Sequence, residues 1–139
     1  MSKFIFLEHT ADVKFQAFGD NLEELFTNSI LAVKQAIAGK TKIKKVKEKK
    51  IEVAGKDYES LMYNLLEEII YFVDADDFTI NDVKEIKLRG FKISAVITGD
   101  KASNYKFTNN IKAVTYSEMF IKKEESLKKR WICQVVLDA

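Results

Sequence analysis

Two stretches of the chain place apolar residues at the three- and four-residue spacing of one helix face. The first fills residues 19–39 and the second follows Gly55. Polar residues stand where helix caps are needed: Asp20, with Glu23 three positions later as in a capping box, and Asp57. The pattern therefore predicts two amphipathic helices. Their apolar positions are Leu22, Leu25, Phe26, Ile30, Val33 and Ile37 in the first, and Tyr58, Leu61, Met62, Leu65, Ile69 and Phe72 in the second.

The two predicted helices also match each other in sequence. A shift of 36 residues (55 − 19) superimposes polar and glycine positions as well as apolar ones, pairing Gly19 with Gly55, Glu23 with Glu59 and Asn28 with Asn64. Helical spacing alone would repeat the apolar positions, but it would not repeat the glycine, glutamate and asparagine. The match therefore predicts an internal duplication.

Seven other segments have the composition or the alternation of strands. They cover residues 4–7, 13–18, 43–53, 83–88, 91–97, 111–121 and 131–137. The alternation changes phase at Gly90, so a tight turn or bulge is expected there. Alternating strands suit a sheet that is covered on one face. We predict an α+β fold, a two-layer α/β sandwich with a mixed or largely antiparallel sheet, two helices on one face and a duplicated strand-helix-strand unit.

Composition fits this picture and limits the class of protein. The chain has 139 residues, is 47% hydrophobic and contains no proline, and no linker interrupts it, so we expect one domain over residues 1–139. No segment reads as a membrane span or a secretory signal, and the expected location is cytoplasmic. The single cysteine, Cys133, lies in an apolar alternating run, which excludes a disulfide framework and predicts a buried, inert thiol.

Charge adds one local feature. The formal net charge is only +2 although 32% of residues are charged, so the overall balance identifies no partner. A lysine-rich stretch stands out, with lysine at positions 40, 42, 44, 45, 47, 49 and 50. It suits either a phosphate-binding surface of an RNA-binding module or chaperone, or an exposed strand edge protected by lysines. The stretch has no aromatic residues to stack on bases, which favours the strand edge.

Groups able to carry chemistry gather at the two ends of the chain. His9 is the only histidine, no phosphate-binding glycine loop is present, and no serine stands in a nucleophile-elbow context. Asp12 lies between two strand-like runs, and Asp138 follows the last strand beside Ala139. Hard cations such as calcium take oxygen ligands from groups of this kind. Taken alone, Asp12 also suits a turn or cap, and Asp138 a solvated chain end.

Three segments carry a resemblance to a known family. Residues 6–13 read Phe-Leu-Glu-His-Thr-Ala-Asp-Val, residues 112–116 read Lys-Ala-Val-Thr-Tyr, and residues 135–138 read Val-Val-Leu-Asp. These segments resemble the signatures of the archease family. The two glycine-led helices resemble that family as well, so the similarity spans nearly the whole chain in order.

The resemblance implies a function and a set of site residues. Archeases act as non-catalytic cofactors of an RtcB-type tRNA-splicing ligase, promoting its guanylylation and multiple turnover, so tRNA would be met only through the ligase. By the same resemblance the ligands of a divalent metal ion, with calcium expected, fall on Asp12, Asp138 and Ala139. His9 is either a ligand or ligase-contacting group near the metal, or an imidazole fixed by a backbone hydrogen bond in the turn. Lys112 is either a solvated side chain or a contact to the ligase or a nucleotide.

The sequence departs from the family pattern in one region. Family members carry an acidic loop with an Arg-His pair before Lys-Ala-Val-Thr-Tyr and a histidine just after it. Here residues 105–110 read Tyr-Lys-Phe-Thr-Asn-Asn, and Ser117 follows Tyr116. Any function that depends on those histidines is therefore not expected here.

Overall fold

The structure, a computed structural model, describes residues 2–9, 12–107, 110–125 and 129–139. Most of this length lies in strands and helices close to those that the sequence predicts. In chain order the elements are β1 (Phe4–Leu7), β2 (Val13–Gly19), α1 (Leu22–Ala38), β3 (Lys47–Ala54), α2 (Tyr58–Ala75), β4 (Phe78–Arg89), β5 (Lys92–Lys101), the short 3-10 helix η1 (Ala102–Asn104), β6 (Ala113–Lys123) and β7 (Trp131–Asp138).

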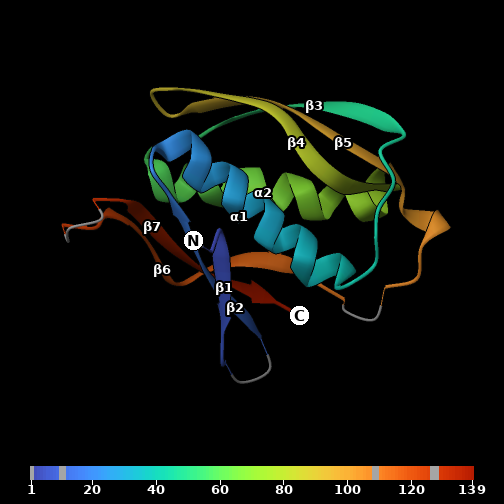
Figure 1. Ribbon diagram of the computed structural model, residues 1–139, viewed down its shortest axis with the longest axis horizontal. Coiled ribbons are helices and arrows are strands. Elements are labelled where there is room, and N and C mark those ends of the chain that lie inside the picture. The colour runs from blue at the N-terminus through green and yellow to red at the C-terminus, as the bar shows by residue number, and fades with distance from the viewer. Residues whose placement is uncertain (1, 10–11, 108–109, 126–128) are drawn as a thin grey trace.

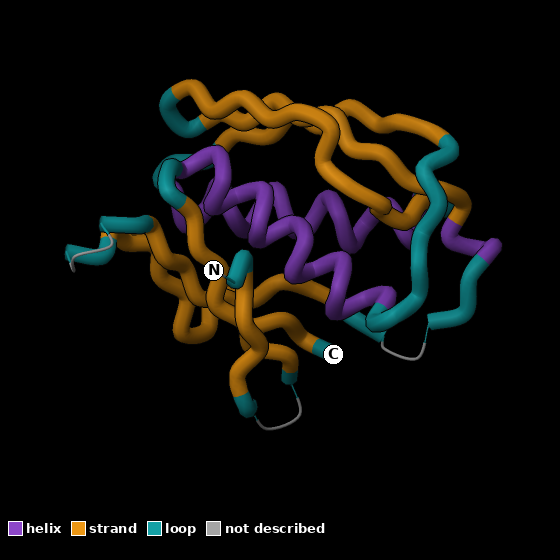
Figure 2. Tube along the Cα trace, viewed as in Figure 1, coloured by secondary structure: helices purple, strands orange, loops and turns teal. Residues whose placement is uncertain are grey.

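The strands form two separate antiparallel sheets. Sheet A has the order β1-β2-β7-β6 and sheet B the order β3-β5-β4. Figure 1 shows the two helices lying between the sheets, and Figure 2 shows the same three layers by type of element. Each helix contacts strands of both sheets.

The predicted α+β class, with its two helices and antiparallel strands, is confirmed. The layering differs, because the strands cover both sides of the helical pair instead of forming one sheet on a single side. The reason lies in the helices, whose buried residues extend well beyond one narrow stripe. In α1 these residues are Leu25, Phe26, Asn28, Ser29, Ile30, Ala32, Val33, Ala36, Ile37 and Ala38. A helix buried this widely needs cover on more than one side.

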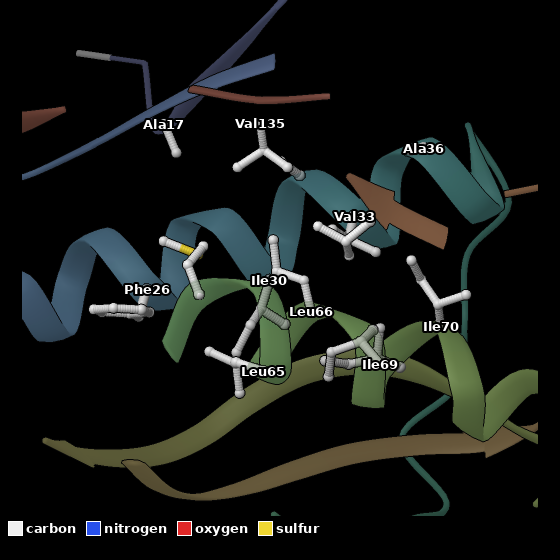
Figure 3. Close-up of a cluster of buried hydrophobic side chains, with 14 of the residues drawn as sticks. Ala17, Phe26, Ile30, Val33, Ala36, Leu65, Leu66, Ile69, Ile70 and Val135 are labelled. Atoms are coloured by element: carbon white, nitrogen blue, oxygen red, sulfur yellow. The ribbon is translucent and has the colours of Figure 1, made fainter. Parts of the chain in front are cut away.

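Figure 3 shows how the layers meet in the core. Val33 of α1 lies near Val135 of β7, while Leu65 and Ile69 of α2 lie toward the strands of sheet B. All four side chains are at most 2% exposed. The helices therefore supply apolar groups to both sheets, and one core cluster joins all three layers.

The helix starts follow local chemistry, with one correction to the sequence prediction. Helix α1 is capped by Asn21, whose side-chain oxygen accepts a hydrogen bond from the Glu24 backbone at 2.8 Å. The prediction of a capping box at Asp20 and Glu23 was therefore wrong by one position. Glu23 instead accepts a hydrogen bond from the Leu88 backbone of β4 at 2.9 Å, so a tertiary contact uses the side chain that local pattern had assigned to the cap. The cap of α2 at Asp57 is confirmed.

The duplication appears as identical contacts in two places. Asn28 donates to the Phe18 carbonyl at 2.7 Å, and Asn64 donates to the Ala54 carbonyl at 2.8 Å, so donors and acceptors are both 36 residues apart. The glycines match as well. A Cβ at either Gly19 or Gly55 would lie 2.5 Å from a backbone nitrogen of the following helix. Each helix thus packs against the end of the strand before it in the same way.

The second repeat lies inside the first along the chain. Strand β3, helix α2 and the hairpin β4-β5 form a continuous unit, and β3 pairs with β5. The first repeat is interrupted by that unit. Its strand β2 and helix α1 precede the unit, its hairpin β6-β7 follows it, and β2 pairs with β7. Gly90, with φ 58°, lies in the β4-β5 turn at the change of phase that the sequence indicated.

Candidate functional site

The pairing of β2 with β7 brings the two polar ends of the chain together. The last paired residues are Val13 and Leu137, and one step further along the same antiparallel register lie Asp12 and Asp138. On the other side of β7, Asp138 pairs with Ala113 of β6, and the Asp138 carbonyl accepts a hydrogen bond from the Lys112 backbone at 2.8 Å. Three segments that are distant in sequence therefore meet at one end of sheet A, where Figure 1 places the C-terminus.

An irregularity in β6 brings a further carboxylate to this face of sheet A. Thr115 pairs with Val136 and Phe120 with Gln134, so residues 116–119 lie opposite Val135 alone. Within this bulge Glu118 has φ 54°, in the left-handed region that non-glycine residues rarely adopt. Gln134 donates to the Glu118 carbonyl at 2.9 Å and holds this conformation. The bulge directs Glu118 back toward β2.

Glu118 links two side chains of the N-terminal segment. Its carboxylate accepts from Lys14 Nζ at 3.1 Å and from His9 Nε2 at 2.9 Å. Hydrogen bonds from Lys14 and His9, together with the positive charge of Lys14, lower the pKa of Glu118 below its ordinary value. The ionised carboxylate therefore fixes both the lysine and the imidazole.

His9 has one nitrogen that this network leaves without a hydrogen bond. Nδ1 is shielded from solvent, has no hydrogen-bond partner among the described residues, and lies 3.7 Å from Asp12 Oδ2. Because Nε2 donates to Glu118, a neutral imidazole carries its lone pair at Nδ1. A lone pair that faces a carboxylate is repelled by it, and a cation bound between the two would remove this repulsion. A cavity of about 840 Å³ opens here, lined in part by His9, Asp12 and Lys14.

No pattern in the sequence indicated Lys14, Glu118 or Gln134 as site residues. Lys14 occupies the outer face of an alternating strand and resembles an ordinary solvated residue. Glu118 lies inside a segment predicted as a regular strand. The signal that was available is the Ser-Glu pair that interrupts the apolar run of residues 111–121. Only the bulge shows that this pair turns toward His9.

The donor chemistry fits a hard cation at the Asp12 and Asp138 end of the sheet. Both are carboxylates, Asp12 is one-third exposed and Asp138 is exposed at the strand end. Across the part of the chain that the structure describes, no three His, Cys, Asp or Glu side chains form a metal-binding group. Ligands beyond the two aspartates would therefore come from Ala139, backbone oxygens or water.

The remaining predicted residues lie as follows. The Lys112 and Ala139 side chains are exposed, at the same end of sheet A. In the region that departs from the family pattern, Tyr105 donates to Asp100 at 2.7 Å and accepts from the Lys44 backbone at 2.9 Å. Positions 108 and 109 of that loop lie outside the described residues. Ser117 is part of the β6 bulge, where its backbone donates to Thr115 at 3.2 Å.

The lysine-rich stretch runs into an edge strand. Residues 40–46 precede β3, and β3 has a strand partner on one side only. All of its lysines are exposed except Lys49, which pairs with Asp76 at 2.7 Å and lies over the Phe72 ring. This placement agrees with protection of an exposed edge.

Two other predictions concern burial. Cys133 is fully buried beside Ser29, and burial raises the pKa of its thiol to about 11, as expected of an inert cysteine. No helix in the described part of the chain combines the length and the apolar character that crossing a membrane requires.

Fold and site together define a class, a duplicated α+β protein whose chain ends form a polar cluster on one sheet. Comparison with known proteins identifies it further. The Archease protein family matches residues 4–139, and the chain belongs to the archease family.

Curated relatives and solved structures agree with this assignment. The chain is 35% identical to the archease of Pyrococcus abyssi, over 99% of each chain, and 38% identical to that of Pyrococcus furiosus, over 94% of each. It resembles the solution structure of Methanobacterium thermoautotrophicum protein 1598 with a TM-score of 0.81 and 28% identity, over the full length of both chains. An archease of Thermotoga maritima, described as a possible chaperone, shares the fold with a TM-score of 0.66 and 19% identity, over 96% and 94% of the two chains.

Proposed function

We propose that this archease is a non-catalytic, metal-binding activator of an RtcB-type RNA ligase in tRNA splicing. It would promote guanylylation of the ligase and its multiple turnover. The observation that supports the proposal is the β2-β7 register, which carries Asp12 and Asp138 to the same end of sheet A. Two carboxylates that are distant in sequence lie there together, and carboxylate oxygens are ligands that a hard cation takes.

The site residues have separate roles in this proposal. Asp12, Asp138 and Ala139 would hold a divalent cation, with calcium expected from the oxygen donors. Bound there, the cation would supply a positive charge that an acceptor group of the ligase or its nucleotide can contact. Glu118 and Lys14 hold the imidazole of His9 beside Asp12. Lys112 stands at the same end, exposed to a partner.

The direct test is multiple-turnover ligation by the cognate ligase, with and without this protein. We expect that added protein turns a ligase limited to about one round into a repeatedly acting one. Asp12→Asn and Asp138→Asn should each remove most of this effect, because loss of one charged ligand weakens a site that has few. Full activation by both variants would contradict the assignment of the metal ligands.

Metal binding is measured separately from activation. Calcium should raise the melting temperature of the unmodified protein, since a ligand that binds only the folded state stabilises it. Asp138→Asn, or a tag added after Ala139, should abolish this rise and leave the metal-free melting temperature nearly unchanged. If a tagged protein responds to calcium and activates ligase as well as the untagged one, Ala139 is not a ligand.

The second candidate function is RNA binding by the lysine-rich stretch, favoured only by the exposure of its lysines. Replacement of Lys40, Lys42 and Lys45 by glutamine tests it. If the stretch only protects an edge, activation of the ligase stays nearly unchanged and aggregation increases. A fall of about tenfold in activation, with folding intact, would favour the RNA-binding function instead.

A further inference from the structure

The outer face of sheet B carries a basic groove at the end formed by the β4-β5 hairpin. Figure 1 shows this sheet as an outermost layer, with no described helix or strand on its far side. The groove has a volume of about 510 Å³. We call it the hairpin groove, and its lining residues are Glu52, Val53, Ala54, Lys87, Arg89, Lys92, Ile93 and Ser94.

The three cations of the hairpin groove lie close together because of the strand register. Arg89 pairs directly with Lys92 across the β4-β5 ladder, and Lys87 lies two positions from Arg89 on the same face. Like charges directly opposite each other destabilise an antiparallel pair. Two positions along a strand correspond to about 7 Å. The sheet therefore holds three cations within a short distance at some cost in stability.

The three cations of the hairpin groove form no ion pair among the described residues. In the described residues the ion pairs engage Lys14, Lys49, Lys84 and Arg130. Lys84, further along β4, pairs with Glu48 of β3 at 2.7 Å. No such pair is formed by Lys87, Arg89 or Lys92, all of which are exposed. The only carboxylate lining the groove is Glu52, which leaves a net charge of +2 (three cations minus one anion).

We propose that the hairpin groove binds the phosphate backbone of single-stranded RNA. An arginine can hold a phosphate through two hydrogen bonds, and the flanking lysines contribute charge with little geometric demand. A polyanion would also relieve the repulsion between Arg89 and Lys92. Ser94, which lies between Glu52 and Lys87 in the strand register, offers a hydroxyl donor.

A phosphate backbone fits the groove better than an acidic protein surface. The cores of protein interfaces are depleted in lysine and charged residues and enriched in aromatic anchors. The hairpin groove has the opposite charge composition, with two lysines and an arginine exposed in its lining. Contacts to phosphate, in contrast, are made mainly by lysine and arginine.

The inference goes beyond the proposed function, because the cluster on sheet A has no part in it. The helical layer lies between the two sheets, the groove belongs to sheet B, and Asp12 and Asp138 lie at one end of sheet A. Both faces are therefore able to be occupied at the same time. Activation of the ligase and binding of RNA by the protein alone are independent measurements.

The test uses a fluorescein-labelled oligouridylate of about 15 nucleotides, a length within the range of single-strand binding sites. Its anisotropy is titrated with the full chain at about 50 mM and about 200 mM salt. One variant replaces all three groove cations by glutamine. The matched control removes the same number of charges from the lysine-rich stretch. The substitutions are Lys87→Gln, Arg89→Gln and Lys92→Gln in the first, and Lys40→Gln, Lys42→Gln and Lys45→Gln in the second.

We expect the groove variant to lose at least about tenfold in affinity at low salt, and the control to lose about twofold or less. The slope of log affinity against log salt should fall by about 2 for three lost phosphate contacts to a single strand. Melting temperatures show that both variants are folded. Ligase activation should remain in the groove variant at saturating RNA, because its sheet A cluster is intact.

Three results would overturn the proposal. The first is absence of binding by the unmodified protein at low salt. The second is an equal loss of affinity in the two variants, which would assign binding to net charge. The third is displacement of the RNA by polyglutamate as effectively as by unlabelled oligouridylate, which would assign the groove to an acidic polypeptide. None of these results bears on the metal site, so failure of this inference is distinguishable from failure of the proposed function.

Discussion

Sheets A and B have the same pattern of strand pairing but differ in the regularity of their hairpins. In each sheet, a strand that leads into a helix pairs with the second strand of a hairpin, as β2 does with β7 and β3 with β5. The first hairpin strand differs. In sheet B it accommodates two single-residue register shifts, whereas β6 of sheet A places residues 116–119 opposite one residue. The candidate site lies where the repeat is least regular, as is common for β-bulges.

The outer faces of the two sheets also differ in charge. On sheet A a carboxylate, Glu118, binds both Lys14 and His9, and the neighbouring strand ends carry Asp12 and Asp138. On sheet B the hairpin end carries Lys87, Arg89 and Lys92, which form no ion pair among the described residues. A net charge of +2 conceals this separation. The two proposals above assign ligands of opposite charge to these two related sheets.

Substitutions of the glycines at the strand ends test whether the two strand-helix junctions contribute equally to the free energy of unfolding. Gly19→Ala and Gly55→Ala should each destabilise the fold by about 3 kcal/mol, because the new Cβ would lie 2.5 Å from backbone nitrogen. The free energy of unfolding is measured by urea denaturation. Losses that differ by more than about 1.4 kcal/mol, a tenfold change in the folding equilibrium, would show that the two junctions are not equivalent.

The paired asparagines should distinguish the repeats, because Asn28 is buried and Asn64 is exposed. Asn28→Ala leaves the Phe18 carbonyl without its partner in the interior and should cost about 2 kcal/mol. Asn64→Ala should cost about 0.5 to 1 kcal/mol, since water can replace the amide. Denaturation curves of the two variants provide the measurement. An equal cost would contradict the role given to burial.

Ion pairs on the outer faces of the two sheets should also differ in how much they stabilise the fold. Lys14, whose side chain is 17% exposed, pairs with Glu118, while Lys84, at 53%, pairs with Glu48. Exposed pairs contribute little because solvent screens them. Lys14→Gln should therefore lower the melting temperature more than Lys84→Gln, and high salt should reduce the difference. Equal melting temperatures would show that the partial burial of Lys14 gives its ion pair no advantage over the exposed one.

The smallest expected effect is on the pH dependence of the melting temperature. Hydrogen bonds and the Lys14 charge lower the pKa of Glu118 from its ordinary value of 4.5. A carboxyl whose pKa is lowered by folding stabilises the native state above its ordinary pKa, and this stabilisation is lost as pH falls below that value. Glu118→Gln should therefore weaken the decline of melting temperature between about pH 5 and pH 3. An unchanged decline would assign acid sensitivity to other carboxyls, such as Glu48 and Asp57, whose pKa values are also lowered.

The sequence by itself determined the elements and their duplication. Periodicity is a local property, so both helices, the strand segments and the turn at Gly90 could be found without the fold. The repeated glycine and asparagine were visible as well, because each serves a contact within its own strand-helix unit. Asp12 and Asp138 could be selected as candidate ligands from their positions beside apolar runs and from the family resemblance.

Only the tertiary structure decided how the strands divide between sheets and which side chains meet. A period of two shows that a strand has a buried face, but it does not show which helix or sheet covers that face. Strand β6 illustrates the limit: its alternation predicts a regular strand, while pairing with β7 produces the bulge at Glu118. Glu118 reaches Lys14 over a separation of 104 residues, and His9 over 109. Contacts over such separations depend on the register of β2, β7 and β6, which no local pattern encodes.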